Sequence, residues 1–196
     1  EKDGLPGLPA RELVDDALRE GWAAALEGLG RIDATGVRWL TEANGLPTSV
    51  LNALMVDREG MLWLGTLKGV AQFRGRAFTN YTVRDGLADN RVRPIVRDRQ
   101  GYLWVGTRRG LNRFDGRRWA VYTEKDGLPS EVVRSLFLDS RGRLWIGTLR
   151  GLALYENGRF HRVPGFPHEA SVMSIVEDRQ GRIWLAAQNL GVFRQN

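Results

Sequence analysis

The stretch DSRGRLWIGTLRGL at residues 139–152 places a turn, a short apolar strand and a second turn in succession. Asp139 starts the first turn and Gly142 ends it, as expected for residues that favour tight turns. The same pattern recurs at 57–70 and 98–111. A pattern that returns in this way predicts a repeat architecture, and the repeat decides the fold before any single motif does.

One Trp in each copy of the pattern sets the repeat length. These anchors, spaced 41, 41, 41 and 39 residues apart, are Trp22, Trp63, Trp104, Trp145 and Trp184. An Asp stands six residues before each anchor, and a Gly stands six residues after each of the first four. We therefore treat the whole chain as one domain and divide it into the units 1–41, 42–82, 83–123, 124–164 and 165–196.

Each unit is expected to form four short strands. In 124–164 these are 132–138, 143–148, 152–155 and 159–163, separated by turns and by the Asn-Gly hairpin at 157–158. Four antiparallel strands per ~40 residues make a β-propeller blade. The sequence thus predicts an all-β fold of about five blades, with the first strand of each blade innermost and the anchor Trp packed between neighbouring blades.

Two recurring features resemble catalytic motifs but are better explained as turns and connectors. The repeated Asp residues belong to Asp-x-x-Gly turns, where the side chain caps local N–H groups, so we do not read them as catalytic carboxylate pairs. Asp-Gly-Leu-Pro or a close variant occurs at 3–6, 44–47, 85–88 and 126–129. No Lys-Ser/Thr follows these words, so they are expected to connect blades and not to bind phosphate.

The two ends of the repeat array are expected to be open. Unit 165–196 ends after its third strand, and residue 1 follows the place where a preceding fourth strand would lie. We expect the chain to be a segment of a larger wheel of about seven blades, or to be completed by a second copy of itself as a homo-oligomer. The degenerate first and last units could cap the array or be weak blades within a longer one.

The repeated words resemble the two-component regulator propeller repeat. Units two to four carry Asp-x-x-Gly-x-Leu-Trp-x-Gly-Thr-x-x-Gly, whereas unit one has Ala23-Ala-Ala25 after its Trp and unit five has Leu185-Ala-Ala187. The resemblance implies the periplasmic or extracytoplasmic sensor domain of a bacterial signal-transduction regulator, a hybrid histidine kinase or a diguanylate cyclase. It implies the remainder of that regulator as a partner and, in some relatives, a glycan fragment as the stimulus.

Composition excludes several classes of protein. Cysteine is absent, which rules out disulfides and thiolate metal sites, and no apolar run reaches the ~18 residues that could span a membrane. No targeting signal is visible. The net charge is +6, but the basic residues are dispersed over every repeat with acids among them, which argues against a nucleic-acid partner.

Basic residues recur on one expected face of the propeller, where a small-molecule or glycan ligand could bind. The loops between second and third strands contribute Lys68, Arg108, Arg109 and Arg150. The residues eleven positions before each anchor Trp, at the start of the first strand, are Arg11, Asn52, Arg93, Arg134 and Met173. Arginines at the channel mouth suit carboxylates, phosphates or sulfated sugars. Alternatively they solvate a rim or pair with acids, because the strand does not alternate cleanly enough to fix which way they face.

A binding role is favoured over an enzymatic one. His161 and His168 are the sole histidines, and neither has an evident nucleophile partner or enough companions for a metal site. No cofactor or metal is expected. Phe78, Trp119 and Phe160 share a position in the fourth strand, where they pack between blades or offer a sugar-stacking surface. The alternatives kept open are a propeller lyase or hydrolase and a protein–protein scaffold.

Overall fold

The computed structural model describes residues 12–15, 21–25 and 28–195, and its strands form five consecutive antiparallel sheets. The first sheet contains β1 (Glu12–Asp15), β2 (Gly21–Ala25), β3 (Gly28–Asp33) and β4 (Gly36–Leu40). The second contains β5 (Leu51–Val56), β6 (Leu62–Thr66), β7 (Gly69–Arg74) and β8 (Ala77–Tyr81). The third contains β9 (Ile95–Arg97), β10 (Leu103–Gly106), β11 (Leu111–Phe114) and β12 (Trp119–Tyr122).

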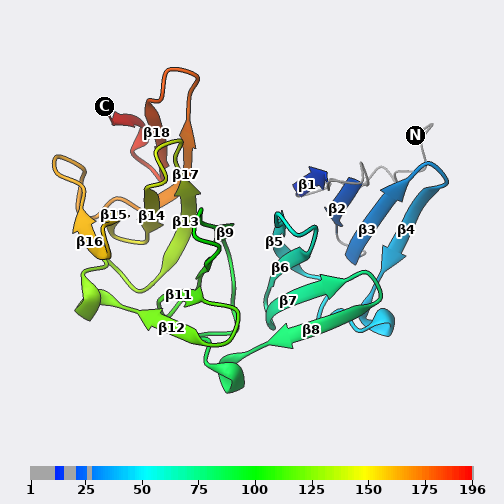
Figure 1. Cartoon of the computed structure of the whole chain (residues 1–196). Helices are drawn as coiled ribbons and strands as arrows, with labels where there is room; N and C mark the ends of the chain where they lie inside the picture. The colour runs from blue at the N-terminus through cyan, green and yellow to red at the C-terminus, as the bar shows by residue number, and fades with distance from the viewer. Residues whose placement is uncertain (1–11, 16–20, 26–27, 196) are drawn as a thin grey trace.

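The last two sheets continue the same plan. The fourth contains β13 (Val133–Leu138), β14 (Leu144–Thr148), β15 (Gly151–Glu156) and β16 (Arg159–Arg162). The fifth has three described strands, β17 (Val172–Glu177), β18 (Ile183–Ala187) and β19 (Gly191–Gln195). Strands pair in chain order within every sheet, and the sheets follow one another along an open arc (Figure 1). The predicted all-β fold of four-stranded antiparallel blades is confirmed.

The connectors between blades contain short 3-10 helices that the sequence analysis did not anticipate. These are η1 (Glu42–Asn44), η2 (Val83–Asp85) and η3 (Glu124–Asp126). In η2, the carboxylate of Asp85 accepts a hydrogen bond from the backbone N–H of Thr82, and Gly86 ends the turn at φ 107°. Leu87 then inserts into the core between the second and third sheets. The three described Gly-Leu motifs therefore act as connectors, each closed by a capping box and held by a buried Leu, whereas the copy at 3–6 lies outside the described residues.

The described residues form four separate apolar cores between neighbouring sheets, and each contains an anchor Trp. Trp104 of β10, which is 1% exposed, packs with Leu128, Val133 and Ile146 of the next blade. The other three cores place Trp22, Trp63 and Trp145 against the following sheet in the same way. Trp184 of the last sheet is more exposed than these. The repeated Trp thus joins each blade to the next.

A repeated Asp fixes the orientation of four of the anchor indoles; the Asp that precedes Trp22 lies outside the described residues. The indole Nε1 donates to the carboxylate six residues earlier at 2.8 Å for Trp63, 2.7 Å for Trp104, 2.9 Å for Trp145 and 2.7 Å for Trp184. The same Asp also caps its turn: Asp139 Oδ1 accepts the backbone N–H groups of Arg141 and Arg143. The Asp is therefore a turn residue, as predicted, and in addition it satisfies a buried N–H that would otherwise lack a partner.

These hydrogen bonds make the fold sensitive to acid. The indole of Trp184 and then the backbone and guanidinium of Arg182 lower the pKa of Asp178. Burial raises the pKa of Asp139, but hydrogen bonds from Trp145 and Arg143 outweigh it and the pKa is lowered. Because an unfolded Asp has a pKa of ~3.9, both ionised carboxylates stabilise the fold above that pH. This stabilisation is lost as the pH falls toward the folded-state values.

We therefore expect urea unfolding to show a free energy that declines below about pH 4, with little contribution from these two carboxyls to any change between pH 5 and pH 7. The variant Asp178→Asn has no carboxyl to protonate at this site, so its decline should be shallower. An equally steep decline in the parent and in Asp178→Asn would show that this carboxylate does not contribute to the acid sensitivity.

The Gly of Leu-Trp-x-Gly-Thr allows the next blade to approach closely. A Cβ atom on Gly106 would lie 2.6 Å from Cγ1 of Val133 in the next blade and 2.6 Å from Cγ of Pro94. Gly65 and Gly147 are similarly covered by Val92 and Val172. We expect Gly106→Ala to lower the free energy of unfolding by about 1–3 kcal/mol, the usual cost of overpacking. A loss below about 0.5 kcal/mol on urea titration would contradict this close contact.

Candidate ligand-binding site

A β-bulge occurs at the same repeat position in three of the sheets. The pairing of β13 with β14 passes from Val133–Thr148 to Ser135–Gly147, which leaves Arg134 as an extra residue. Asn52 in β5 and Met173 in β17 are bypassed in the same way. In the third sheet Pro94, which has no N–H, follows Arg93, and β9 begins only at Ile95. A bulge redirects a side chain from the regular alternation of a strand.

The bulged residues follow a buried residue that anchors the strand. Val92, Val133 and Val172 are fully buried and cover the Gly of the preceding sheet. The next residue, Arg93, Arg134 or Met173, lines a cavity on the inner side of the arc. In each blade a buried residue is followed directly by a residue that the irregular pairing turns toward the cavity. Strict alternation along the strand therefore could not predict the direction of these side chains.

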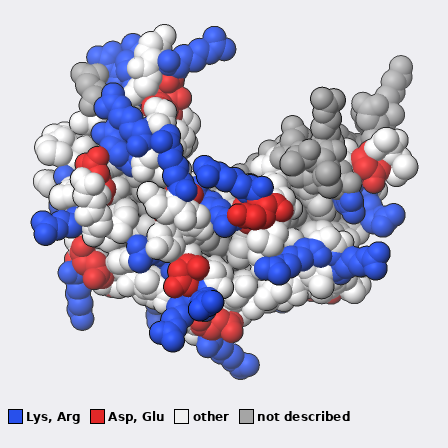
Figure 2. All heavy atoms as spheres, viewed as in Figure 1, with Lys and Arg blue, Asp and Glu red and all other residues white. Residues whose placement is uncertain are grey.

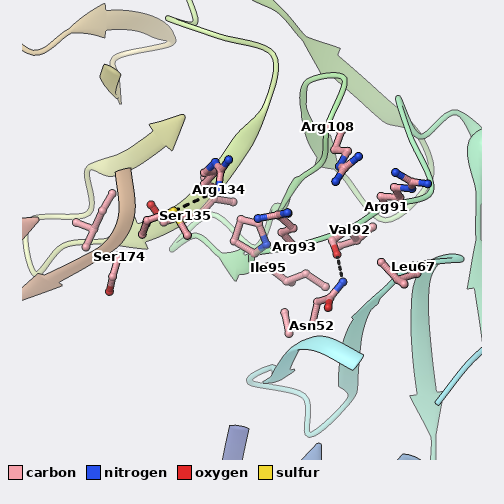
Figure 3. A pocket seen from close by; sticks show the side chains of 15 residues that line it. Asn52, Leu67, Arg91, Val92, Arg93, Ile95, Arg108, Arg134, Ser135 and Ser174 are labelled. Atoms are coloured by element: carbon pink, nitrogen blue, oxygen red, sulfur yellow. Dashed lines mark hydrogen bonds between the residues drawn. The ribbon is translucent and has the colours of Figure 1, made fainter. Parts of the chain in front are cut away.

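The cavity has a volume of about 740 Å³ and is bordered by first strands from four sheets (Figure 3). Its polar lining consists of Asn52, Arg91, Arg93, Arg108, Arg134, Ser135 and Ser174, and its apolar lining includes Leu67, Pro94, Ile95 and Met173. Two hydrogen bonds tie its wall together across blades. Asn52 Nδ2 donates to the carbonyl of Val92 at 2.8 Å, and Ser135 Oγ donates to that of Val172 at 3.1 Å.

The structure brings together four of the residues predicted to bind a ligand. Asn52, Arg93, Arg108 and Arg134 line the cavity. Three others do not line it: Arg109 lies 4.0 Å from Asp89, Arg150 lies 3.1 Å from Glu124, and Lys68 extends from the loop between β6 and β7. Arg11 lies outside the described residues. Ligand binding by any of them stays a prediction.

Sequence reasoning missed several other lining residues, among them Ser135 and the three that follow. Arg91 directly precedes the buried Val92, Leu67 lies in the loop between β6 and β7, and Ser174 follows the bulge in β17. The repeat itself offered a signal for Ser174, because it occupies the position of Ser135 and Ala53 one residue beyond the candidate ring. Arg91 had no such signal. The equivalent positions in the other described blades are Val50, Val132 and Ser171, and none of them is basic.

Positive charge is concentrated at the centre of this cavity. Burial, followed by the neighbouring charges of Arg134 and Arg108, lowers the pKa of Arg93. No carboxylate of the described side chains lies within 4.0 Å of the guanidinium nitrogens of these three arginines. Elsewhere basic and acidic side chains are interspersed on the visible face of the molecule (Figure 2). An arginine remains protonated despite such a shift, so the cavity carries positive charge that no described carboxylate pairs with.

The other residues singled out in the sequence lie away from the cavity. Phe78, Trp119 and Phe160 pack against Phe73, Phe114 and Tyr155 of their own sheets, with ring centroids 4.6–4.8 Å apart. His161 is exposed, and Nδ1 of His168 lies 3.5 Å from Nη1 of Arg162. Within the described parts of the chain, no group of three His, Asp or Glu side chains could hold a metal ion.

The repeat seen in the structure matches a known family. The family model described as "two component regulator propeller" matches residues 45–68, 86–109, 127–150 and 165–189. The chain belongs to the two-component regulator propeller family. The matches include the fifth unit of this propeller despite its Leu-Ala-Ala variation, whereas residues 1–41 lie outside them.

Solved structures share the propeller fold. The extracellular domain of a hybrid two-component system from B. thetaiotaomicron is 24% identical with a TM-score of 0.84; the match covers 96% of this chain and 28% of that chain. PorZ of Porphyromonas gingivalis is 13% identical with a TM-score of 0.72, covering 100% and 34%. Virginiamycin B lyase from Staphylococcus aureus is 13% identical with a TM-score of 0.68, covering 94% and 68%.

These likenesses concern the fold of the propeller. The chain spans less than a third of the length of the first of these structures. No curated relative matches its sequence. In the described ranges, none of the helices has the length and apolar character needed to cross a membrane.

Proposed function

We propose that this propeller is the ligand-sensing part of a bacterial signal-transduction regulator and that its ligand, a small molecule or glycan, binds in the cavity between the first strands. Membership of the two-component regulator propeller family supports the class of protein. The observation that carries the site is the alignment of one repeat position, in four blades, along a single cavity. Side chains from several blades can therefore contact the same ligand.

The partners and location follow from the same proposal. The remainder of the regulator, a kinase or cyclase output domain, would receive the signal, and the propeller would lie outside the cytoplasm. The structural relative from B. thetaiotaomicron is an extracellular domain, which supports this placement. A longer repeat array, or a second copy of the chain, would extend the open arc of blades into a closed wheel.

We propose binding without catalysis. The polar side chains that line the cavity are Arg, Asn and Ser, and none of these ordinarily titrates near neutral pH. A general acid or base needs a pKa near the working pH, which His, Glu, Asp or Lys more readily supplies. This lining is suited to holding a ligand by hydrogen bonds and charge.

A steric block tests the location of the site. Ser174 is an exposed residue of β17 whose side chain borders the cavity, so Ser174→Trp should fill part of it. We expect a ligand found by calorimetric screening of an oligosaccharide and organic-acid panel to bind this variant at least about tenfold more weakly than the parent. The matched control is Thr79→Trp, which adds the same ring at an exposed position of the outer strand β8.

Binding should be equal in the parent and in Thr79→Trp. A ligand that binds Ser174→Trp as tightly as the parent would place the site elsewhere on the propeller. The role in signalling is tested separately in cells that produce the full-length protein, where Ser174→Trp should abolish the response of its output to that ligand.

A further inference from the structure

Of the four arginines that line the cavity, Arg93, Arg108 and Arg134 meet without a neutralising acid among the described side chains. Arg93 and Arg134 occupy the same repeat position in neighbouring sheets, and Arg108 extends from the loop between β10 and β11 (Figure 3). After burial, the charges of Arg134 and Arg108 also lower the pKa of Arg93, so each of the two lies close enough to repel it. Like charges in a partly buried site are unfavourable unless an anion joins them.

The hydrogen bonding of Arg134 is also incomplete. Its Nε is buried and has no partner among the described residues. Its Nη1 lies 3.3 Å from Sδ of Met173, and a thioether is a weak acceptor. Arg143 and Arg182 differ, because each donates through Nε to an Asp, at 2.7 Å and 2.6 Å respectively. The donors of Arg134 therefore lack the strong acceptor that Arg143 and Arg182 have.

Resting on the proposed ligand-sensing function, we propose that the cavity recognises an oxyanion, held between the guanidinium groups of Arg93 and Arg134 with Arg108 above them. A carboxylate, sulfate or phosphate group supplies the acceptors that these donors lack, and a guanidinium can hold two of its oxygens at once. The bound anion would bridge two blades and relieve the repulsion between the guanidinium groups of Arg93 and Arg134.

The flanks of the site indicate where the charge of the ligand lies. Asn52 in the second sheet and Met173 in the fifth occupy the same repeat position as the two arginines but carry no charge. The oxyanion is therefore expected at the third and fourth sheets, while an uncharged remainder of the ligand extends toward Asn52 or Met173.

Inorganic sulfate and phosphate serve as probes, measured by thermal unfolding against chloride at matched ionic strength. Sulfate stabilises most proteins through exclusion from their surface, so the informative quantity is the excess over a matched control. The test variant is Arg93→Gln/Arg134→Gln. The control is Arg159→Gln/Arg162→Gln, which removes two positive charges from exposed residues of the outer strand β16, outside the cavity. Specific binding to the folded chain raises the unfolding midpoint with anion concentration.

We expect the parent and the Arg159/Arg162 control to gain equally from sulfate or phosphate, and the Arg93/Arg134 variant to gain less, with an apparent affinity at least about tenfold weaker. In chloride the variant should be at least as stable as the control, because it removes repulsion. Arg93→Lys/Arg134→Lys keeps the two charges but loses the planar guanidinium groups that can each hold two oxygens. This variant should show an intermediate gain in the unfolding midpoint. Equal gains in all four proteins would mean general salt effects only and would overturn the oxyanion site.

The same set of variants separates this inference from the proposed function. A neutral ligand that is blocked by Ser174→Trp but binds Arg93→Gln/Arg134→Gln as tightly as the parent would leave the ligand-binding cavity standing and overturn its oxyanion specificity. Loss of anion binding in both Ser174→Trp and the Arg93/Arg134 variant would support the two together.

Discussion

Trp104→Ala should lower the free energy of unfolding by about 3–5 kcal/mol, the cost of deleting a large aromatic side chain from a core. The indole is 1% exposed and lies between the third and fourth sheets, where its ring centroid is 4.8 Å from that of Tyr155. Its removal leaves a cavity between two blades and takes the donor from Asp98. Urea titration followed by far-ultraviolet circular dichroism would measure the loss.

Trp184→Ala is the matched comparison. Trp184 makes the same hydrogen bond to its Asp but is only half-buried, because no described sheet follows it. Its replacement should therefore cost clearly less than that of Trp104. Equal losses for the two variants, or a loss below about 1 kcal/mol for Trp104→Ala, would show that contact with the next blade is not what makes the anchor Trp stabilising.

Asp139→Ala should destabilise the chain by roughly 2–4 kcal/mol, because it leaves several donors without an acceptor. The Asp139 carboxylate, 2% exposed, accepts from Trp145 Nε1 at 2.9 Å, from two backbone N–H groups of its turn and from the Arg143 guanidinium at 2.7 Å. The indole N–H is in the core between sheets, where water does not replace the carboxylate. Chemical denaturation of the variant at pH 7 provides the measurement.

Asp115→Ala is a control for the loss of an Asp from a turn. Asp115 also accepts backbone N–H groups, from Arg117 and Arg118, but its turn is exposed. We expect a loss nearer ~1 kcal/mol for this variant, as for a capping residue. Comparable losses at the two positions would mean that the indole contact adds nothing to the effect of the turn.

The blade architecture could be predicted from the sequence because the repeat recurs at a fixed spacing. In 124–164, the predicted strands 132–138, 143–148, 152–155 and 159–163 differ from the observed ones by one residue or less at each end. Turn chemistry fixed these boundaries, since Asp139 to Gly142 and Asn157–Gly158 each end a strand. The extra 3-10 turns were missed, although Thr82 and Asp85 have the spacing of a capping box.

The ligand site could be predicted only in part. The repeat identified Arg93 and Arg134 as equivalent, but the direction of their side chains depends on the bulge at Arg134 and on Pro94. A bulge follows from how one strand pairs with its neighbour, which local alternation does not reveal. The second contact of the four described Asp residues, to an indole six residues later, likewise needed the folded β-strand to bring the two side chains together.

The most direct test of the cavity as a ligand site is anomalous diffraction from crystals of the chain soaked in selenate, an oxyanion of the shape of sulfate. We predict an anomalous peak between the guanidinium groups of Arg93 and Arg134, within hydrogen-bonding distance of both, that is absent from crystals of Arg93→Gln/Arg134→Gln. Selenate peaks at other surface arginines, with none in this cavity at any concentration that the crystals tolerate, would contradict it.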